Sequence, residues 1–333
     1  MPISFKQSSA LLCTAALFVT NYSSAEQDPF SPGFGGTISI NLGYGESQSQ
    51  HNLDDDNAIT ADLNNQGKKS KQAAPFFLGR LQYSFGNTLI YLGNSEEQIT
   101  EAQFQAELGI AHQLSRDTVF TAALFGNIPG MDEIWQDPYL TGQKRSKTEQ
   151  DISGARFALE MGAPLPLTLK YAIAESTIEN DAIGVSQGLT VQQLTQLARE
   201  SRYQRFGAEI SLPLSQRFIL SPAFYYTLRD AEGAAKSHQL LSAQLSFVIN
   251  ASNHSFVTTL RRSEATFDAS NPVFARKQDY QDIGIFSVYS YAEPFAWRNV
   301  QLHAMAGYQT LDSDIDFYDS QSTFVSTGIS YSF

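Results

Sequence analysis

The chain has almost no cysteine, few basic residues and no long apolar run. Its one cysteine, Cys13, stands in the N-terminal segment, so the rest of an exported chain must fold without disulfides. Lys and Arg number 22 against 34 Asp and Glu, for a net charge of −12, which excludes a basic surface for nucleic acid. The sequence beyond that segment has no run of about 18 apolar residues, which excludes a protein that crosses a membrane with helices.

The first 25 residues have the features of a cleavable signal peptide. One cation, Lys6, precedes an apolar run at residues 10–19, and small residues lead up to Ala25 as the cleavage position. The run is shorter than the roughly 20 residues that a membrane-spanning helix needs. We therefore expect residues 1–25 to be removed and residues 26–333 to form one exported domain.

Apolar and polar residues alternate along most of the remaining sequence. In the last ten residues, FVSTGISYSF, large side chains take every second position up to the terminal Phe333, and small polar residues stand between them. The segments at 34–44 and 300–309 alternate in the same way. Because successive side chains of a β-strand point to opposite faces, each segment predicts a strand with one apolar and one polar face.

Short and long connections alternate between these predicted strands. The longer, polar loops cover about residues 48–74, 94–100, 127–149, 177–202, 230–236, 265–277 and 311–321. This pattern requires about 14 antiparallel strands, with 12 or 16 as alternatives because the strand at 88–94 is short. Short turns at one end and longer loops at the other are typical of outer-membrane barrels. The sequence therefore predicts an all-β fold, a closed antiparallel transmembrane β-barrel of the outer-membrane type.

Aromatic residues are abundant and gather near the predicted strand ends. The chain has 23 Phe and 15 Tyr, enough for aromatic girdles at the two membrane interfaces of a barrel. The end of the chain resembles the signal by which outer-membrane barrels are passed to their assembly machinery. The positions of this assembly signal are Val325, Thr327, Ile329, Tyr331 and Phe333. We therefore expect outer-membrane lipid, lipopolysaccharide and the barrel assembly machinery as partners, small solutes if the barrel is a pore, and no nucleic acid.

Several short stretches resemble those of one protein family. They are EIWQDPYLTGQ at 133–143, SGARF at 153–157, NPVF at 271–274, PFAW at 294–297 and DIDFYD at 314–319. The family is an uncharacterised one of Gram-negative outer-membrane proteins, known only as a domain of unknown function. The resemblance covers most of the mature chain and implies an outer-membrane location and a barrel fold. It transfers no catalytic residue to any position of this sequence.

The predicted inward face of the barrel carries charges of both signs. The pore-lining candidates are Arg80, Glu107, Arg156, Glu160, Lys170, Arg205, Glu209 and Arg261. Such charges can line a water-filled pore and set its ion preference, or they can pair across the lumen and close it. Eight-stranded barrels fill their interior with side chains, whereas 16-stranded ones leave a channel. About 14 strands is nearer to the second case and favours a hydrated lumen.

The third long loop combines aromatic and acidic residues. Its candidates for a constriction are Asp132, Glu133, Trp135 and Asp137. One interpretation is a loop folded into the barrel mouth, where the acidic groups would act as a filter. The alternative is a loop packed on the rim for stability.

The fourth long loop contains a short helical pattern. Thr190 is the expected N-cap, and Val191, Leu194, Leu197 and Ala198 would share one face. Such a helix would cover the rim of the barrel or act as a lid or docking surface.

The sequence offers little for catalysis or metal binding. His112 and His254 are expected at the short-turn end and His303 inside the barrel, so only His238 is expected near the loop end with acidic neighbours. The segment DSDIDFYD spaces three Asp residues like a calcium loop but lacks the required Gly and Glu. We therefore expect no enzyme, no catalytic residue, no cofactor and no metal.

These features favour a passive pore for small hydrophilic solutes in the outer membrane. One alternative is a non-conducting barrel that stabilises the envelope or binds a partner through its loops. Another is a hydrolase at the rim that uses His238. Charge pairs across the lumen would favour the first alternative, and a serine or carboxylate hydrogen-bonded to His238 would favour the second.

Overall fold

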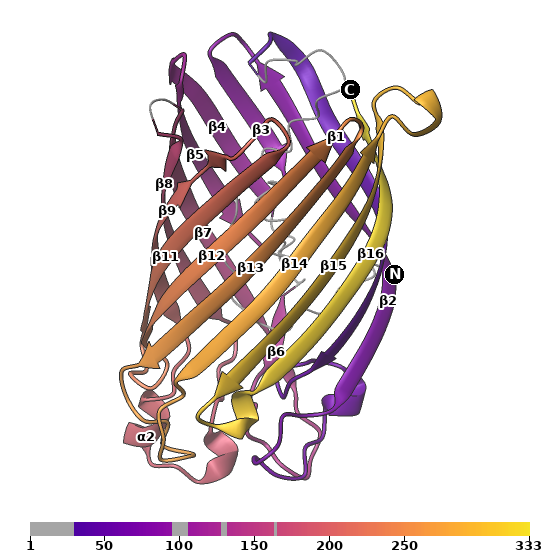
Figure 1. The fold of residues 1–333 in the computed structure, drawn as a ribbon. Helices are drawn as coiled ribbons and strands as arrows, with labels where there is room; N and C mark the ends of the chain where they lie inside the picture. The colour runs from indigo at the N-terminus through magenta and orange to yellow at the C-terminus, as the bar shows by residue number, and fades with distance from the viewer. Residues whose placement is uncertain (1–29, 95–105, 128–131, 163–164) are drawn as a thin grey trace.

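The strands of the chain close into an antiparallel barrel (Figure 1). The computed structural model describes residues 30–94, 106–127, 132–162 and 165–333, and in these residues 14 strands form the wall. They are β1 (Gly33–Gln48), β2 (Lys69–Ser84), β3 (Thr88–Gly93), β4 (Ala106–Ser115), β5 (Thr118–Gly126), β7 (Lys147–Met161), β8 (Leu167–Ile178), β9 (Ser201–Ile210), β11 (Phe218–Ala231), β12 (His238–Ala251), β13 (His254–Phe267), β14 (Tyr280–Ala292), β15 (Val300–Ser313) and β16 (Ser320–Ser332). Two short strands, β6 (Glu133–Trp135) and β10 (Leu212–Pro213), lie at the ends of the barrel.

The last strand pairs with the first, as the sequence predicts. β16 runs antiparallel to β1 from the pair Thr37 and Ser332 to the pair Gln48 and Gln321. This pairing leaves no open edge between the chain ends, which a barrel in lipid requires because every backbone polar group must find a partner. The predicted count of about 14 strands is confirmed, including the short β3.

Each strand has one apolar outer face and one largely polar inner face. On β1, Phe34, Ile40 and Leu42 are more than half exposed, whereas Ser39 and Asn41 between them are buried. The side-chain period of two carries this division along the whole strand, because a shift of one residue would exchange the two faces. The predicted faces of the strands are therefore confirmed.

The connections differ at the two ends of the barrel. At one end the strands are joined by short turns and by the small helix η3 (Pro294–Ala296), and at the other by longer loops that contain the remaining helices (Figure 1). The predicted loops match these connections, although β2 begins at Lys69, inside the loop predicted to end at 74. The predicted loop at 94–100 lies almost wholly outside the described residues. None of the described helices is long and apolar enough to span a membrane.

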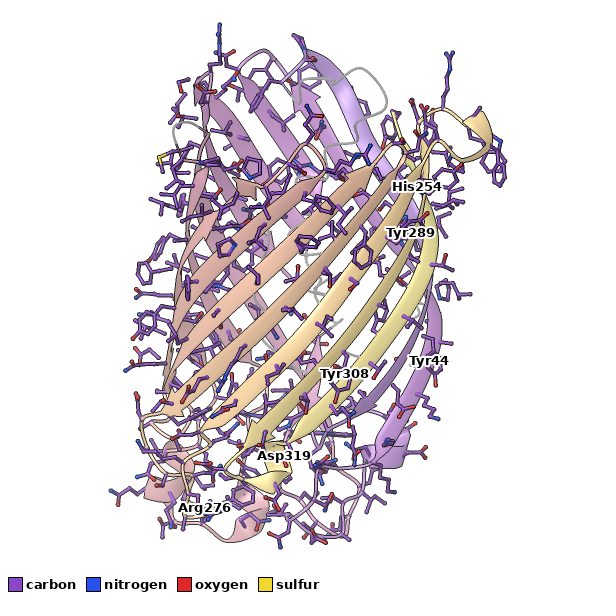
Figure 2. All side chains as sticks on the ribbon, in the orientation of Figure 1. Tyr44, His254, Arg276, Tyr289, Tyr308 and Asp319 are labelled. Carbon is purple, nitrogen blue, oxygen red and sulfur yellow. The ribbon has the colours of Figure 1, made fainter. Side chains whose placement is uncertain are left out.

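Several aromatic side chains are exposed on the outer face of the wall. Tyr44, Tyr289 and Tyr308 are more than a third exposed and point away from the barrel (Figure 2). At the short-turn end, Phe333 packs against Phe34 with ring centroids 5.8 Å apart. Large residues of the predicted assembly signal lie on this exposed face of β16, so their alternation is confirmed, whereas their recognition by the assembly machinery stays a prediction.

The helices of the long loops are short. They are η1 (Asp55–Asn57), η2 (Val185–Gln187), α2 (Val191–Thr195) and η4 (Asp316–Tyr318). Thr190 is the N-cap of α2, in a capping box with Gln193, as predicted for the cap. The predicted apolar helix face is wrong, because Val191 is 82% exposed and Leu197 lies beyond the helix end. Leu197 is fully buried among other loops, so tertiary packing and not a continuous helix face decides its position.

Candidate functional site: the barrel interior and its loop cap

All eight pore-lining candidates lie on the interior face of the wall. Each strand that carries one exposes the apolar side chains at alternate positions, such as Leu108 beside Glu107, Phe157 beside Arg156 and Leu260 beside Arg261. Each candidate is next to an outward-facing residue of its strand, so its own side chain points inward. Their role in conduction stays a prediction, while their contacts divide them into clusters.

The first cluster, here called the Tyr91 cluster, contains Tyr91, Arg80, Glu107 and Arg156. Arg156 holds Glu107 in a two-pronged ion pair, with Nη2 to Oε1 at 2.5 Å and Nε to Oε2 at 2.8 Å. The Tyr91 hydroxyl donates a hydrogen bond to the same carboxylate, and the Arg80 guanidinium lies 4.0 Å from the Tyr91 ring centroid. Glu107 is only 1% exposed, so its charge depends on these partners.

The second cluster, here called the Tyr225 cluster, repeats this composition on β8, β9 and β11. Lys170 Nζ lies 3.1 Å from Glu209 Oε2 and 3.4 Å from the Tyr225 hydroxyl. The Arg205 guanidinium lies 4.5 Å from the Tyr225 ring centroid. Each cluster thus combines one tyrosine, one glutamate and two cations.

Three interior ion pairs of the described residues join strands on the same side of the barrel. Arg156 and Glu107 belong to β7 and β4, which are separated only by β5. Lys170 and Glu209 stand on the adjacent strands β8 and β9. Arg261 pairs at 2.8 Å with Asp282 of the neighbouring β14. These three pairs compensate charge on the wall without joining opposite sides of the barrel.

Large rings on the interior face lie directly opposite glycines of the adjacent strand. The facing pairs are Tyr91 with Gly109, Phe125 with Gly154, Tyr225 with Gly207 and Phe286 with Gly307. A Cβ atom at Gly154, Gly207 or Gly307 would stand 2.6 to 2.9 Å from the facing ring. The missing side chain leaves the space in which each ring packs on the wall. Rings held in this way project less into the interior than upright ones.

Replacing Gly207 by Val is expected to displace Tyr225 from the wall. The new Cβ would stand 2.6 Å from the ring, so the ring must turn into the interior and separate from Lys170 and Arg205. We expect a smaller single-channel conductance in a planar bilayer. The matched control is Gly45→Val, because a Cβ at Gly45 has Thr323 O at 3.7 Å as its nearest atom. Equal conductance of the two variants would contradict the inference that Gly207 keeps the Tyr225 ring out of the interior.

The long loops join into one packed structure, here called the loop cap. It consists of residues 49–68, 132–146, 179–200, 232–237, 268–279 and 314–319, numbered below as loops 1, 3, 4, 5, 6 and 7. Its buried core contains Tyr139, Ile183, Leu197, Ala235, Ile315, Phe317 and Tyr318, with Leu63, Leu189, Val273 and Phe274 packed around it. All six loops contribute to this core, so they form one cooperative unit.

Loops from opposite sides of the barrel meet in the cap. The hydroxyls of Tyr139 in loop 3 and Tyr318 in loop 7 are hydrogen-bonded, although six wall strands separate the two loops in one direction around the barrel and eight in the other. Loop 1 contacts loop 7 in the same core, because the His51 ring stacks on the Tyr318 ring with centroids 5.5 Å apart. The cap therefore extends across the mouth, in contrast to the ion pairs of the wall.

Two of the constriction candidates hold the loops together. The Trp135 indole is 2% exposed and donates a hydrogen bond to the Gln50 carbonyl at 3.1 Å. Asp137 accepts hydrogen bonds from the backbone of Tyr139, Gly184 and Ser186, at 2.9 to 3.1 Å. These contacts match the packed-rim interpretation of the third loop.

The other two constriction candidates occupy the start of the same loop. Glu133 lies 3.8 Å from Lys147 on the adjacent strand. Burial raises the pKa of Asp132 above its ordinary value. A role of either carboxylate in filtering solutes stays a prediction.

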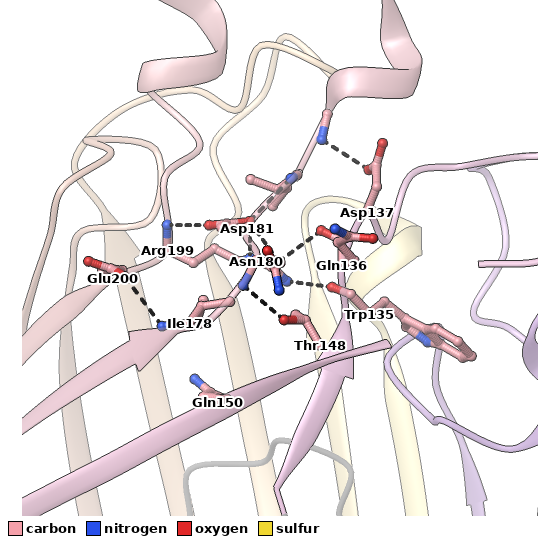
Figure 3. A network of polar contacts seen from close by, with 12 residues as sticks. Trp135, Gln136, Asp137, Thr148, Gln150, Ile178, Asn180, Asp181, Arg199 and Glu200 are labelled. Atoms are coloured by element: carbon pink, nitrogen blue, oxygen red, sulfur yellow. Dashed lines mark hydrogen bonds and ion pairs between the residues drawn. The ribbon is translucent and has the colours of Figure 1, made fainter. Parts of the chain in front are cut away.

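Arg199 fastens loop 4 to loop 3 (Figure 3). Its guanidinium donates to the carbonyls of Trp135 and Gln136 at 2.9 and 3.0 Å, and it pairs with Asp181 at 2.7 Å. Asn180 adds a backbone hydrogen bond to the Thr148 hydroxyl at 3.0 Å. The planar guanidinium thus satisfies two strand-end carbonyls and one carboxylate at once.

A buried lysine lies at the centre of the cap. Lys236 is 5% exposed, and its ammonium group donates to the hydroxyls of Tyr318 at 2.9 Å and Tyr139 at 3.3 Å. Asn271 donates to the hydroxyls of Tyr139 at 2.9 Å and Tyr318 at 3.0 Å. Burial lowers the pKa of Lys236 well below its ordinary value and raises the pKa of Tyr139 to about 12.

The cap is expected to weaken in acid because of His51. Burial, together with the positive charges of Lys236, Arg145 and Arg199, lowers the pKa of His51 from 6.5 to about 3. The unfolded cap therefore binds a proton that the packed cap excludes, and stability is lost as the pH falls from about 6.5 toward 3. Lys236 also makes the packed cap less stable as the pH falls, because its pKa in the packed cap is lowered as well.

Limited proteolysis of the folded barrel at pH 7 and pH 4, with an acid-active protease at the lower pH, measures this effect. We expect faster loop cleavage at pH 4 in the wild type and a smaller change in His51→Phe, which retains a ring against Tyr318. Equal pH dependence of the two proteins would exclude His51 as a source of the acid sensitivity.

His238 lacks the surroundings of a catalytic base. Its ring packs on Phe267 with centroids 4.6 Å apart, and Nδ1 lies 3.3 Å from the Lys236 carbonyl oxygen. Among the described residues, no serine or carboxylate is hydrogen-bonded to this imidazole. The condition set for a rim hydrolase is therefore not met in this part of the chain.

The residues that connect the loops are not among the candidates that the sequence predicts. Lys236, His51, Tyr318 and Asn271 stand far apart in the sequence. Asn271 and Tyr318 lie in the stretches NPVF and DIDFYD, but those stretches do not indicate which residues meet. The glycines beneath the rings were a detectable signal, because Gly109 and Gly207 both interrupt the inward face of a strand. Only the register of the neighbouring strand shows which ring covers each glycine.

A protein family and several solved structures are similar to this chain. A family model described as "Protein of unknown function (DUF2860)" matches residues 33–332. No curated protein matches the sequence. Among solved structures, the chain is similar to the outer membrane channel DcaP of Acinetobacter baumannii, with 7% identity and a TM-score of 0.47 over 90% of this chain and 96% of that chain. It is also similar to OmpT of Vibrio cholerae, with 7% identity and a TM-score of 0.46 over 90% and 97% of the two chains. It is similar as well to the CymD monoaromatic hydrocarbon channel, with 11% identity and a TM-score of 0.46 over 92% of this chain and 91% of that chain.

Proposed function

Since this chain belongs to the DUF2860 family, whose function is unknown, we propose from its geometry that it is a passive channel for small hydrophilic solutes in the outer membrane. The observation that carries the proposal is the arrangement of the interior. Three interior ion pairs join wall strands that are adjacent or separated by one strand, and large rings lie over glycines. Both kinds of side chain therefore leave the axis of a 14-stranded barrel less obstructed.

The proposed location follows from the two faces of the wall. Exposed apolar side chains around the barrel suit the hydrocarbon core, and aromatic residues near the strand ends suit its interfaces. The long loops and the cap would then face the outside and meet lipopolysaccharide. The outward residues of β16 would be the part recognised by the assembly machinery. Passive diffusion needs no catalytic group and no cofactor.

Single-channel recording of the refolded chain in a planar bilayer tests the proposal. Heat-modifiable gel mobility first establishes that the barrel is folded. We expect discrete and reproducible conductance steps. Silence from a folded barrel, both in the wild type and in a variant with a disrupted cap, would overturn the channel proposal.

The loop cap favours a second candidate, a barrel that does not conduct and presents its loops to a partner. The contact of Tyr139 with Tyr318 across the mouth is the specific observation in its favour. The two candidates differ in one result. A channel restricted by the cap conducts more when the cap is loosened, whereas a non-conducting barrel stays silent in either state.

A further inference from the structure

Three cations follow one another on the interior faces of three neighbouring wall strands. Lys170 of β8 faces Gly207 of β9, and Arg205 stands two residues from Gly207 toward the long loops. Arg205 in turn faces Thr227 of β11, and Arg229 stands two residues from Thr227 in the same direction. Each step thus moves one strand sideways and two residues toward the loop cap. Lys170, Arg205 and Arg229 are called the cation column below.

The cation column runs nearly parallel to the axis of the barrel. Neighbouring strands lie about 4.8 Å apart and each residue advances about 3.3 Å, so a step is about 8 Å long and lies about 36° from the strand direction. Strands of such barrels tilt by about 35–45° from the axis. In Figure 1 the strands of the near side lean toward their lower-numbered neighbours as they approach the long loops, whereas each step of the column goes toward the higher-numbered neighbour. The step therefore cancels the tilt, and the three cations lie one above another.

Tyrosine rings hold the cations against the wall. The Lys170 ammonium group lies 5.8 Å and the Arg205 guanidinium 4.5 Å from the centroid of the Tyr225 ring, so the two charges are close together. The Arg229 guanidinium lies 5.5 Å from the centroid of the Tyr203 ring. A ring face attracts a cation without neutralising its charge. These contacts therefore fix the positions of the three side chains and add no negative charge to the column.

The cation column is more positive at its upper end, near the loop cap. At the lower end Lys170 forms an ion pair with Glu209, and the same step taken backward from Lys170 reaches Glu160 of β7. At the upper end Arg229 donates to the Ser201 hydroxyl at 2.9 Å and to a carbonyl of loop 4 at 3.1 Å. Both of these acceptors are neutral, and no carboxylate of the described residues pairs with Arg229.

The wall opposite the cation column carries no charge on its interior face. β1 lies seven strands from β9 in either direction around the barrel. The inward residues of β16, beside β1, are serine, glycine and phenylalanine. Those of β1 are Thr37, Ser39, Asn41, Gly43, Gly45 and Ser47. These two strands therefore do not oppose the field of the column, which draws an anion to the wall of β8, β9 and β11.

We propose that the cation column is a row of binding sites for small oxyanions beneath the loop cap. The inference rests on the proposed channel function and names its solute class. The oxygens of the anion accept hydrogen bonds from the guanidinium groups of Arg205 and Arg229, whose planar donors match an oxyanion. Sites about 8 Å apart let the anion pass from one cation to the next without being retained at any of them.

Binding of inorganic phosphate to the folded barrel in a neutral detergent tests the sites without any measurement of conduction. The line width of the phosphate signal in phosphorus NMR is followed as phosphate is titrated, against a blank of empty micelles. We expect saturable broadening, although the net charge of −12 disfavours non-specific binding of an anion to this chain. No broadening beyond that of the empty micelles would overturn the proposal.

Three variants locate the binding. Arg205→Gln and Arg229→Gln are each expected to weaken phosphate binding about tenfold, since one charge-assisted hydrogen bond contributes about that factor. Arg202→Gln is the control, because it removes the same charge from an exposed, outward position of β9. Heat-modifiable mobility shows that each variant is folded. Unchanged affinity in both Arg205→Gln and Arg229→Gln, or an equal loss in Arg202→Gln, would exclude the cation column as the site.

The outcomes separate this inference from the channel proposal. A barrel that binds phosphate through Arg205 and Arg229 but never conducts would overturn the channel and leave the oxyanion sites. A barrel that conducts but does not bind phosphate would overturn the oxyanion sites and leave the channel.

Discussion

Replacing Phe317 by Ala is expected to open the loop cap and raise the conductance of the barrel. Phe317 is fully buried, and its ring lies 5.2 to 5.9 Å from those of Tyr139, Phe274, Tyr318 and His51. Removal of such a ring from a packed core costs about 3–5 kcal/mol. The cost falls on the cap, because the wall is held by its own continuous hydrogen-bond ladder.

Two measurements follow this change. Limited proteolysis should cleave the loops of Phe317→Ala faster than those of the wild type, and single-channel recording should show larger or longer openings. Phe295→Ala is the matched control, because that ring is 76% exposed at the short-turn end. Unaltered cleavage in Phe317→Ala would show that the loops do not depend on a shared core.

Replacing Glu107 by Gln is expected to shift the ion preference of the interior toward anions. The variant removes the carboxylate that Arg156 holds in its ion pair, while Arg80 and Arg156 keep their charges around Tyr91. Loss of a partner from a buried pair also destabilises a protein by about 3 kcal/mol. The shift is measured as a reversal potential in a salt gradient across a planar bilayer.

The opposite change provides the comparison. Arg156→Gln is expected to move the preference toward cations, because Glu107 keeps its charge and loses its strongest partner. Glu264→Gln is the control, since Glu264 is exposed on the outer face of β13. If all three variants keep the wild-type reversal potential, the Tyr91 cluster does not lie on the path of the ions.

The wall could be predicted because its information is local. Alternation along a strand such as β1 shows which side chains lie on the outer face. It also restricts the pairing register of neighbouring strands, because a shift of one residue would exchange the two faces. The same rule placed all eight lumen candidates inside. It failed for Val191 and Leu197, because the fourth loop is organised by its neighbours and not by the period of a helix.

The contacts of the candidates could not be predicted in the same way. Arg156 and Glu107 are 49 positions apart in the sequence, and Tyr139 and Tyr318 are 179 apart. Which charge meets which depends on the shear of the barrel and on side chains of intervening strands. The sequence therefore left open whether the charges cross the lumen, and it did not distinguish a filter loop from a packed one.

By itself the sequence determined the barrel, a strand number of about 14 with 12 and 16 left open, and the two faces of the wall. Each is encoded by a period of two and by the lengths of the connections. The tertiary structure decided the wall-bound ion pairs, the rings over glycines and the loop cap. Each of these joins residues distant in the chain, and such contacts depend on how the closed barrel brings its strands and loops together.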